Sequence, residues 1–183
     1  GEEQLREVPG AVQSLRIEPS DPEGPPEVVA ALLAADLVVL GPGSLFSSTI
    51  PPALVPAIRD AINRTDAKLV YVANIMTEVG ETDGFDAFAH VEAITRHGVR
   101  APDVVLVNST PIDPERLKNY VSEGAQVVEA STAAFAEAGI RLMPVPMLGR
   151  GEYAQHDSVM LARVLAEMAV ASVAPEPLTQ PAP

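Results

Sequence analysis

Short apolar runs rich in Val, Ile and Leu alternate with longer Ala- and Leu-rich segments along most of this chain. That alternation, repeated about five times, is typical of βα units built around a largely parallel sheet. The runs are continuously apolar, as expected of strands that are covered on both faces. We expect strands at residues 14–19, 36–40, 68–74, 103–108, 125–130 and 140–145.

The intervening segments carry recognisable helix boundaries. Asp113 can cap a helix whose first turn holds Pro114 and Glu115. Ser131 or Thr132 can cap the next helix, and a glycine can end it. We expect helices near residues 26–34, 52–63, 86–98, 114–121, 131–138 and 157–172.

These elements predict an α/β fold, a Rossmann-like three-layer α/β/α arrangement with a mostly parallel sheet. Aromatic residues make up only 4% of the chain, so the core must be built from Ala, Val, Leu and Ile. No linker or repeat divides residues 1–173, which we expect to form one domain. The proline-rich residues 174–183 are expected to form a tail.

Charge and composition exclude several classes of function. Twelve basic residues against 25 acidic ones repel nucleic-acid backbones, so no nucleic-acid polymer is expected as a partner. No apolar stretch is long enough to span a membrane, and the first residues do not have the pattern of a signal peptide. The absence of cysteine excludes disulfides and fits a reducing cytosol, so a cytoplasmic location is expected.

Three polar loops each follow a predicted strand. In a parallel sheet of βα units such loops open on the same edge, where ligands bind. The stretches GPGSLFSST, NIMTEVGETDGF and NSTPIDP follow the runs at 36–40, 68–74 and 103–108. We therefore expect all three loops to converge on one site.

The first loop could hold a phosphate group. Gly41 and Gly43 allow positive φ and close approach of the backbone to a ligand, while neighbouring hydroxyls supply donors. Pro51 or Pro52 then suits the first turn of a helix, whose free amides favour an anion. The candidate phosphate-binding residues are Gly41, Pro42, Gly43, Ser44, Ser47 and Ser48. The pattern is neither a P-loop nor a dinucleotide fingerprint, and a tight turn with serine caps explains it about as well.

The second loop is dense in short polar groups that could orient sugar hydroxyls or hold Mg²⁺. A solvated turn with a helix cap before Phe85 is the alternative. The candidate sugar- or base-binding residues here are Asn74, Thr77, Glu81, Thr82 and Asp83, and Asn108 in the third loop joins them.

The three histidines receive different interpretations. His90 and His97 lie seven residues apart on one predicted helix without metal-ligand spacing, so surface or helix-end roles are expected. His156 precedes the last helix and could project into the site, although Asp157 beside it could simply cap that helix. No Ser-His-Asp triad is legible.

Three stretches carry a resemblance to a known family: LVVLGPGSLFSSTIPPALVPAIRDAI, VYVANIMTEVGETDGFDAFAHVEAI, and DVVLVNSTPID with Tyr120 in LKNYVSEGA. The chain resembles the YvcK-type gluconeogenesis factors, which are related to 2-phospho-L-lactate transferase (CofD-like), from about residue 1 to residue 170. The resemblance implies a Rossmann-like fold in the bacterial cytoplasm. It also implies binding of UDP-sugars such as UDP-N-acetylglucosamine, a role in carbon metabolism and cell-wall or cell-shape control, and no assigned reaction or required cofactor.

Two departures from the family pattern bear on the site. The family's glycine-rich GGGTG-type strand-loop-helix has no counterpart, so the chain is expected to be the C-terminal part of a larger domain that lacks its N-terminal strands. Near the end, Gln155 stands where the family usually has Arg, which would weaken a phosphate contact unless Arg150 or Arg141 reaches the same place.

Three hypotheses remain open. In the preferred one a nucleotide-sugar binder holds phosphate in the first loop and orients sugar or base with the second loop and Asn108, while Tyr120 and His156 close the site. A Mg²⁺-dependent transferase, with the metal on Asp83 or Glu81, is the alternative. In the third, an inert fragment pairs with another chain through an exposed sheet edge, which would make a homo-oligomer.

Overall fold

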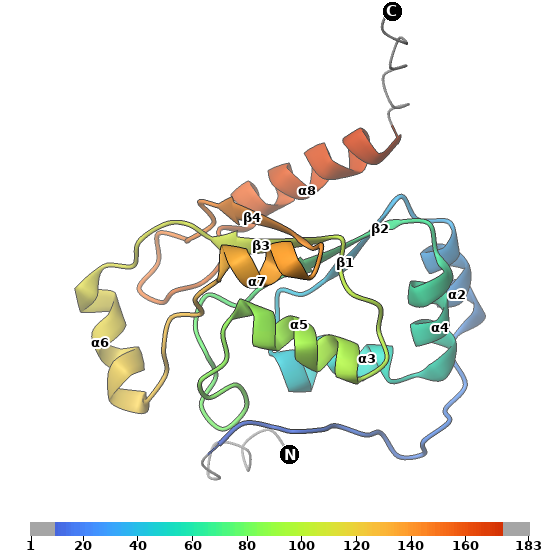
Figure 1. Cartoon of the computed structure of the whole chain (residues 1–183), viewed down its shortest axis with the longest axis horizontal. Helices are drawn as coiled ribbons and strands as arrows, with labels where there is room; N and C mark the ends of the chain where they lie inside the picture. Colours follow the sequence, from blue (N-terminus) through green and yellow to red (C-terminus); the bar gives the residue numbers. More distant parts are fainter. Residues whose placement is uncertain (1–9, 174–183) are drawn as a thin grey trace, which may run out of the picture.

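The computed structural model describes residues 10–173, and a four-stranded parallel sheet forms its centre. The strands follow one another across the sheet in chain order, and all three pairings are parallel. Their bounds are β1 (Leu37–Leu40), β2 (Lys68–Val72), β3 (Val104–Asn108) and β4 (Arg141–Val145). The predicted α/β fold with a parallel sheet is therefore confirmed (Figure 1).

Helices cover both faces of this sheet. Right-handed crossovers between strands in simple chain order place their connecting helices on one face, where α3, α5 and α7 lie. The last helix, α8, follows β4 and crosses the opposite face (Figure 1). The bounds are α2 (Pro26–Leu33), η1 (Leu45–Thr49), α3 (Ile50–Ala53), α4 (Pro56–Arg64), α5 (Ala87–Arg96), α6 (Pro114–Glu123), α7 (Thr132–Glu137) and α8 (Ser158–Val173).

Alternate side chains of each strand fill two separate cores. Tyr71 on β2 packs with Phe46 and Phe135 on the face of the sheet that carries α3, α5 and α7. Its neighbours Val70 and Val72 point the opposite way, into the core beneath α8. The sheet is thus the middle of three layers, and its continuous apolar runs arise because both faces are covered.

Two of the predicted strands are wrong. Residues 14–19 run without a strand partner, and the amide of Leu15 donates instead to the ring of His97. Residues 125–130 form only an isolated antiparallel bridge, between Val127 and Met76. Both segments have strand-like apolar residues, but residues 14–19 bond to the His97 ring and the backbone of residues 125–130 bonds to residues 75–77 of the second loop.

The predicted helix at 52–63 is also different in the structure. Helical turns begin directly after Ser44, whose carbonyl accepts the amides of Ser48 and Thr49. These turns form η1 and α3, with Pro51 and Pro52 in the first turn of α3 as expected. Pro56 has no N–H to continue α3, so a new helix, α4, starts there.

Other helix boundaries match the sequence signals. The side chain of Asp113 caps α6, that of Ser131 caps α7, and Gly139 ends α7 with a φ of 69°. Within residues 10–173, no helix is both long enough and apolar enough to cross a membrane. The single-domain assignment of residues 1–173 stays a prediction, and the tail at 174–183 lies outside the described residues.

Candidate functional site

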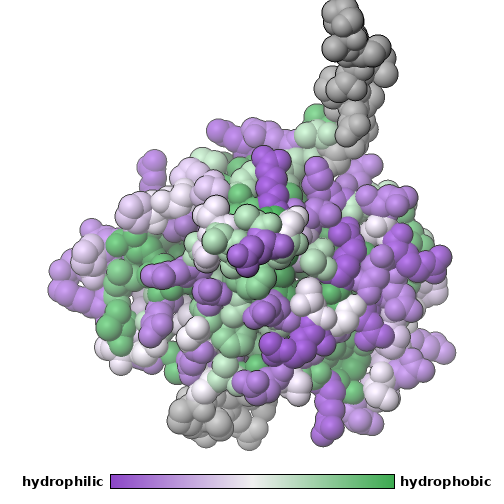
Figure 2. All heavy atoms as spheres, viewed as in Figure 1, coloured by the Kyte–Doolittle hydropathy of each residue, from purple (hydrophilic) through white to green (hydrophobic). Residues whose placement is uncertain are grey.

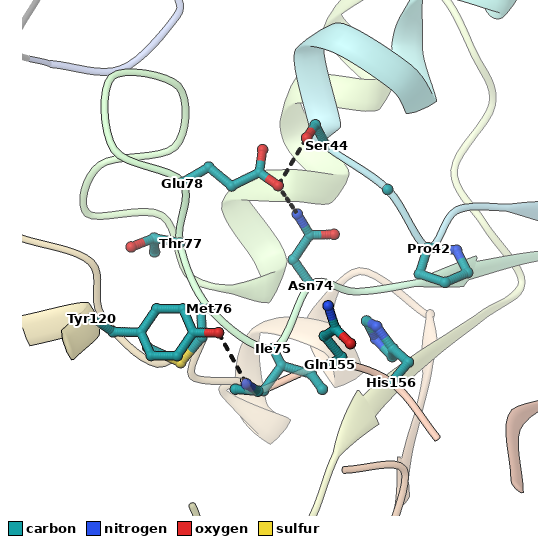
Figure 3. Close-up of a pocket in the computed structure, with 12 residues that line it drawn as sticks. Pro42, Ser44, Asn74, Ile75, Met76, Thr77, Glu78, Tyr120, Gln155 and His156 are labelled. Carbon is teal, nitrogen blue, oxygen red and sulfur yellow. Dashed lines mark hydrogen bonds between the residues drawn. The ribbon is translucent and has the colours of Figure 1, made fainter. Parts of the chain in front are cut away.

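A cavity of 540 Å³ opens where the loops after β1 and β2 meet the segment before α8 (Figure 3). Its lining comes from residues 42–44, residues 74–78, Tyr120 and residues 154–156. The first two polar loops therefore converge at the carboxyl edge of the sheet, as expected. The third loop does not line this cavity, so the expected convergence of all three loops holds only for the first two. The Asn108 side chain is hydrogen-bonded to the backbone of Thr110.

The glycine at the end of β1 holds the first loop close to β2. Gly41 has a φ of 80°, and a Cβ there would lie 3.0 Å from the Val72 carbonyl oxygen. Only glycine fits such a position without strain. The chain can therefore turn at once, and it presents Pro42, Gly43 and Ser44 to the cavity.

Glu78 links the two loops at the cavity wall. The Ser44 hydroxyl donates to Glu78 Oε1 at 2.9 Å, and Asn74 Nδ2 donates to the same oxygen at 3.4 Å (Figure 3). The Ser44 proton is thereby directed to the carboxylate, so its oxygen keeps only acceptor capacity for a guest. Sequence reasoning did not single out Glu78, since nothing in its spacing separates it from Glu81.

Three predicted site residues shape the second loop and do not line the cavity. Thr82 is fully buried, and its hydroxyl oxygen accepts the Glu78 amide at 2.8 Å. The Asp83 carboxylate accepts the amides of Gly80 at 3.2 Å and Gly10 at 3.1 Å. Glu81 is buried, with 4% of its surface exposed. The bend in the loop thus brings the side chains of Thr82 and Asp83 onto amides of the same loop.

Thr77 and Tyr120 do line the cavity, and the side chain of each also forms a hydrogen bond with the backbone of a neighbouring segment. Thr77 Oγ1 accepts the amide of Gln126 at 2.8 Å. The Tyr120 hydroxyl accepts the amide of Ala154 at 2.9 Å, which ties α6 to the segment before α8. Their predicted place at the site is therefore consistent with the geometry.

His156 reaches the cavity from the start of α8 as a neutral ring. Its Nε2 lies 3.1 Å from the Ala73 carbonyl oxygen, which can only accept, so Nε2 carries the proton. Burial lowers the pKa of His156, and the carbonyl partner opposes that shift only in part. Asp157 next to it caps α8 by accepting the amides of Val159 and Met160.

Ser47 and Ser48 lie on η1, outside the cavity lining. Ser48 is exposed to solvent. The Ser47 hydroxyl is buried and has no hydrogen-bond partner. The Ser48 side chain lies against the first loop, where its Cβ is 3.3 Å from the position of a Cβ added at Gly43.

The cavity lining holds one carboxylate, Glu78, and no Lys or Arg. Neither Arg150 nor Arg141 lines it, so neither supplies the cation that the resemblance led us to expect near position 155. Arg116 on α6 donates instead to the carbonyl oxygens of Gly149 and Tyr153. Among residues 10–173 there is no group of three or more His, Cys, Asp or Glu side chains that could hold a metal ion.

A buried aromatic pair lies on the face of the sheet that carries α5. The rings of Tyr71 and His90 stack at 6.4 Å, and His90 Nδ1 donates to the Asp86 carbonyl at 2.7 Å. Burial raises the pKa of the Tyr71 hydroxyl, and the negative charge of Glu78 raises this pKa further. The backbone amide of Asn74 opposes both effects. Burial also lowers the pKa of His90. The expected surface or helix-end role is wrong for His90, which is fully buried, and right for His97 at the end of α5.

A family model described as 2-phospho-L-lactate transferase CofD matches residues 1–148. The chain belongs to the CofD family. The motifs' resemblance to YvcK-type gluconeogenesis factors is also confirmed. This CofD-family chain is 31% identical over 170 residues to the gluconeogenesis factor of Bacillus subtilis, covering 92% of this chain and 54% of the relative. A Deinococcus radiodurans protein provisionally named a gluconeogenesis factor is 42% identical over 166 residues, covering 91% of this chain and 35% of that protein.

The fold of this CofD-family chain also matches a crystal structure. A Bacillus halodurans protein, described as a member of the UPF0052 family, superposes with a TM-score of 0.85 at 30% sequence identity. The match covers 91% of this chain and 54% of the other. The chain thus spans about half the length of that protein and of the B. subtilis relative, and about a third of the D. radiodurans one.

Proposed function

We propose that this CofD-family chain contributes the site of a nucleotide-sugar-binding regulatory protein, with a ligand of the UDP-N-acetylglucosamine type. The observation that carries the proposal is the cavity at the carboxyl edge of the sheet, which is built from two post-strand loops, α6 and the start of α8. Its 540 Å³ suit a small organic ligand. We further propose that the protein acts in the cytoplasm, in carbon metabolism and cell-wall or cell-shape control.

The phosphate end of the ligand belongs beside the backbone of Gly43, because the Ser44 hydroxyl donates its proton to Glu78 and can only accept from a ligand. Gly43 and Ser44 both line the cavity wall, and the Ser48 side chain packs against Gly43, where an added Cβ would lie 3.3 Å from the Ser48 Cβ. No cation lines the cavity, so backbone amides and neutral side chains must supply the donors. Such a site binds a diphosphate more weakly than a site with an arginine would.

The sugar or base end belongs against the second loop and α6. Asn74, Glu78 and the neutral ring of His156 offer both donors and acceptors to hydroxyl and amide groups. Tyr120 supplies an aromatic wall on the α6 side. Glu78 favours the uncharged, donor-rich end of the ligand, because a carboxylate repels phosphate and accepts from hydroxyls.

Calorimetric titration of the intact protein with UDP-N-acetylglucosamine tests this proposal. Saturable binding without turnover is expected, and Ser44→Ala and Tyr120→Ala should each weaken it about tenfold, by loss of one polar or aromatic contact. Tyr153→Ala is the matched control, because Tyr153 is exposed and adjoins Ala154 in the chain without lining the cavity. Unchanged binding in both site variants would remove those residues from the site.

A Mg²⁺-dependent transfer of a phosphorylated group is a second candidate, favoured by the description of the matching family model. Asp83 does not fit the metal role at this cavity, because it does not line the cavity and its carboxylate accepts the amides of Gly80 and Gly10. Glu78 is the carboxylate that lines the cavity and could share the metal with substrate phosphates. Product formation that disappears on chelation and in Glu78→Gln, but survives in Asp83→Asn, would favour this candidate. Intact nucleotide after long incubation with Mg²⁺ favours the binder.

A further inference from the structure

A second cavity, which we name the α6 groove, lies between α6, residues 84–86 and residues 124–129. Its volume is 580 Å³. The apolar side chains that line it are Met76, Phe85, Leu117, Val121 and Val127. Val121 and Val127 are exposed, at 66% and 41%, although both are large hydrophobic residues. Hydrophobic atoms gather over α6 on this side of the molecule (Figure 2).

All the charged groups that line the α6 groove are acidic. Asp86 and Glu129 line it, and Glu78 and Glu123 line a smaller cavity that adjoins it at Ala125. The two cations of α6 are engaged elsewhere, since Lys118 pairs with Glu115 at 2.7 Å and Arg116 binds backbone carbonyls. An apolar floor with a wholly acidic lining complements a partner that is apolar in the middle and basic at its edges.

The helix beside the groove is held by few contacts. Apart from Asn119, whose side chain is not described, no residue of α6 is buried. The contacts that hold it include the hydrogen bond between the Tyr120 hydroxyl and Ala154, the hydrogen bond from Arg116 to Gly149, and the packing of Leu117 and Tyr120 near Ile75. A helix with so little buried surface shifts at low free-energy cost.

The same helix lines both cavities. Tyr120 lines the candidate functional site, while Leu117 and Val121 line the α6 groove. Met76 lines both cavities as well. A shift of α6 that improves the fit of a ligand in one cavity therefore also changes the shape of the other cavity. Such a shared element is the structural requirement for coupling between two sites.

We propose that the α6 groove docks a basic amphipathic segment of a partner protein, and that α6 couples this docking to occupancy of the candidate functional site. Apolar side chains of the segment fill the floor between Leu117, Val121 and Val127, and its Lys or Arg residues face Asp86 and Glu129. The docking stands on the groove alone. The coupling rests on the proposed nucleotide-sugar function.

The docking is tested with a synthetic probe: a fluorescent 14-residue peptide of Leu and Lys, with Leu at helical spacing, titrated against the intact protein at physiological salt. Val121→Ser should weaken binding about tenfold through loss of an apolar anchor. Val170→Ser is the matched control, since Val170 is 72% exposed on α8, and it should leave binding unchanged. A peptide with Ser in place of Leu keeps the charge and should bind at least tenfold more weakly. Equal binding of both peptides, equal effects of both variants, or no binding would overturn the docking.

The coupling is tested by repeating the titration at saturating UDP-N-acetylglucosamine. The peptide affinity should change about 5- to 150-fold, and the peptide should change the affinity for the sugar nucleotide by the same factor. Tyr120→Phe, which removes the acceptor for the Ala154 amide, should reduce that factor. Independent binding of both ligands would overturn the coupling and leave the proposed function intact. Peptide docking without any sugar-nucleotide binding would refute the proposed function and the coupling, and would support the docking.

Discussion

Replacing Gly41 by alanine should destabilise the protein through two separable effects. A φ of 80° costs an L-residue about 1–2 kcal/mol. The new Cβ would also lie 3.0 Å from the Val72 carbonyl oxygen, a backbone atom that cannot move aside as a side chain can. Such overpacking adds about 1–3 kcal/mol. The free energy of unfolding should therefore fall by about 2–5 kcal/mol in Gly41→Ala.

Gly124→Ala isolates the cost of the positive φ from the cost of the close contact. Gly124 has a φ of 91°, and a Cβ there would meet nothing within 4 Å, so this variant should lose only about 1–2 kcal/mol. Any gain from restricting the unfolded chain is common to both variants and cancels in the difference. Urea unfolding with fitted m-values measures both losses. Equal destabilisation of the two variants would refute the close approach of Gly41 to β2 on which the shape of the first loop depends.

Three further predictions concern buried groups on the face of the sheet that carries α5. Phe135→Ala should lower the free energy of unfolding by about 3–5 kcal/mol, since this fully buried ring packs edge-to-face on Phe88; a loss below about 1 kcal/mol in urea unfolding would contradict the packing. Because the pKa of His90 is lowered by burial, its contribution to stability is present above the unfolded pKa near 6.5 and is lost as the pH falls below it; His90→Phe should flatten that part of the stability–pH curve, and an unchanged slope would count against the buried neutral ring. Tyr71→Phe removes a buried hydroxyl that has no hydrogen bond of normal geometry, so thermal unfolding should show a change within about 1 kcal/mol, and a loss above about 2 kcal/mol would reveal a partner for that hydroxyl.

The sheet and most helices were predictable because local pattern and buried position agree. Residues 37–40 are continuously apolar, and β1 is covered by packing on both faces of the sheet. Helix starts at Asp113 and Ser131 followed from side chains that reach their own backbone amides. The meeting of the first two loops followed from topology alone, since parallel strands end at one edge.

The internal geometry of the second loop could not be predicted in the same way. Glu78 and Asp83 are both carboxylates in one polar stretch, and spacing does not say which faces a ligand. The bend of the loop decides it, because Asp83 accepts the Gly80 amide while Glu78 meets Ser44 from another loop. A contact between residues 34 positions apart leaves no mark on local sequence.

The failed strands have a related cause. Residues 125–130 have strand-like composition, yet their backbone pairs with residues 75–77 of the second loop, as the Thr77 amide does with the Gln126 carbonyl at 2.7 Å. In residues 14–19, the amide of Leu15 donates to the ring of His97 at the end of α5, where a strand would have bonded to a neighbouring strand. A strand needs a free neighbouring edge, and that is a property of the whole fold.

The most direct test of the central claim is amide chemical-shift mapping of the intact ¹⁵N-labelled protein during titration with UDP-N-acetylglucosamine. The account predicts that amides at residues 43–44, 74–78 and 154–156, together with Tyr120, shift along a single saturable curve, because they line one cavity. Shifts confined to one of these segments, or centred on a different surface, would contradict it.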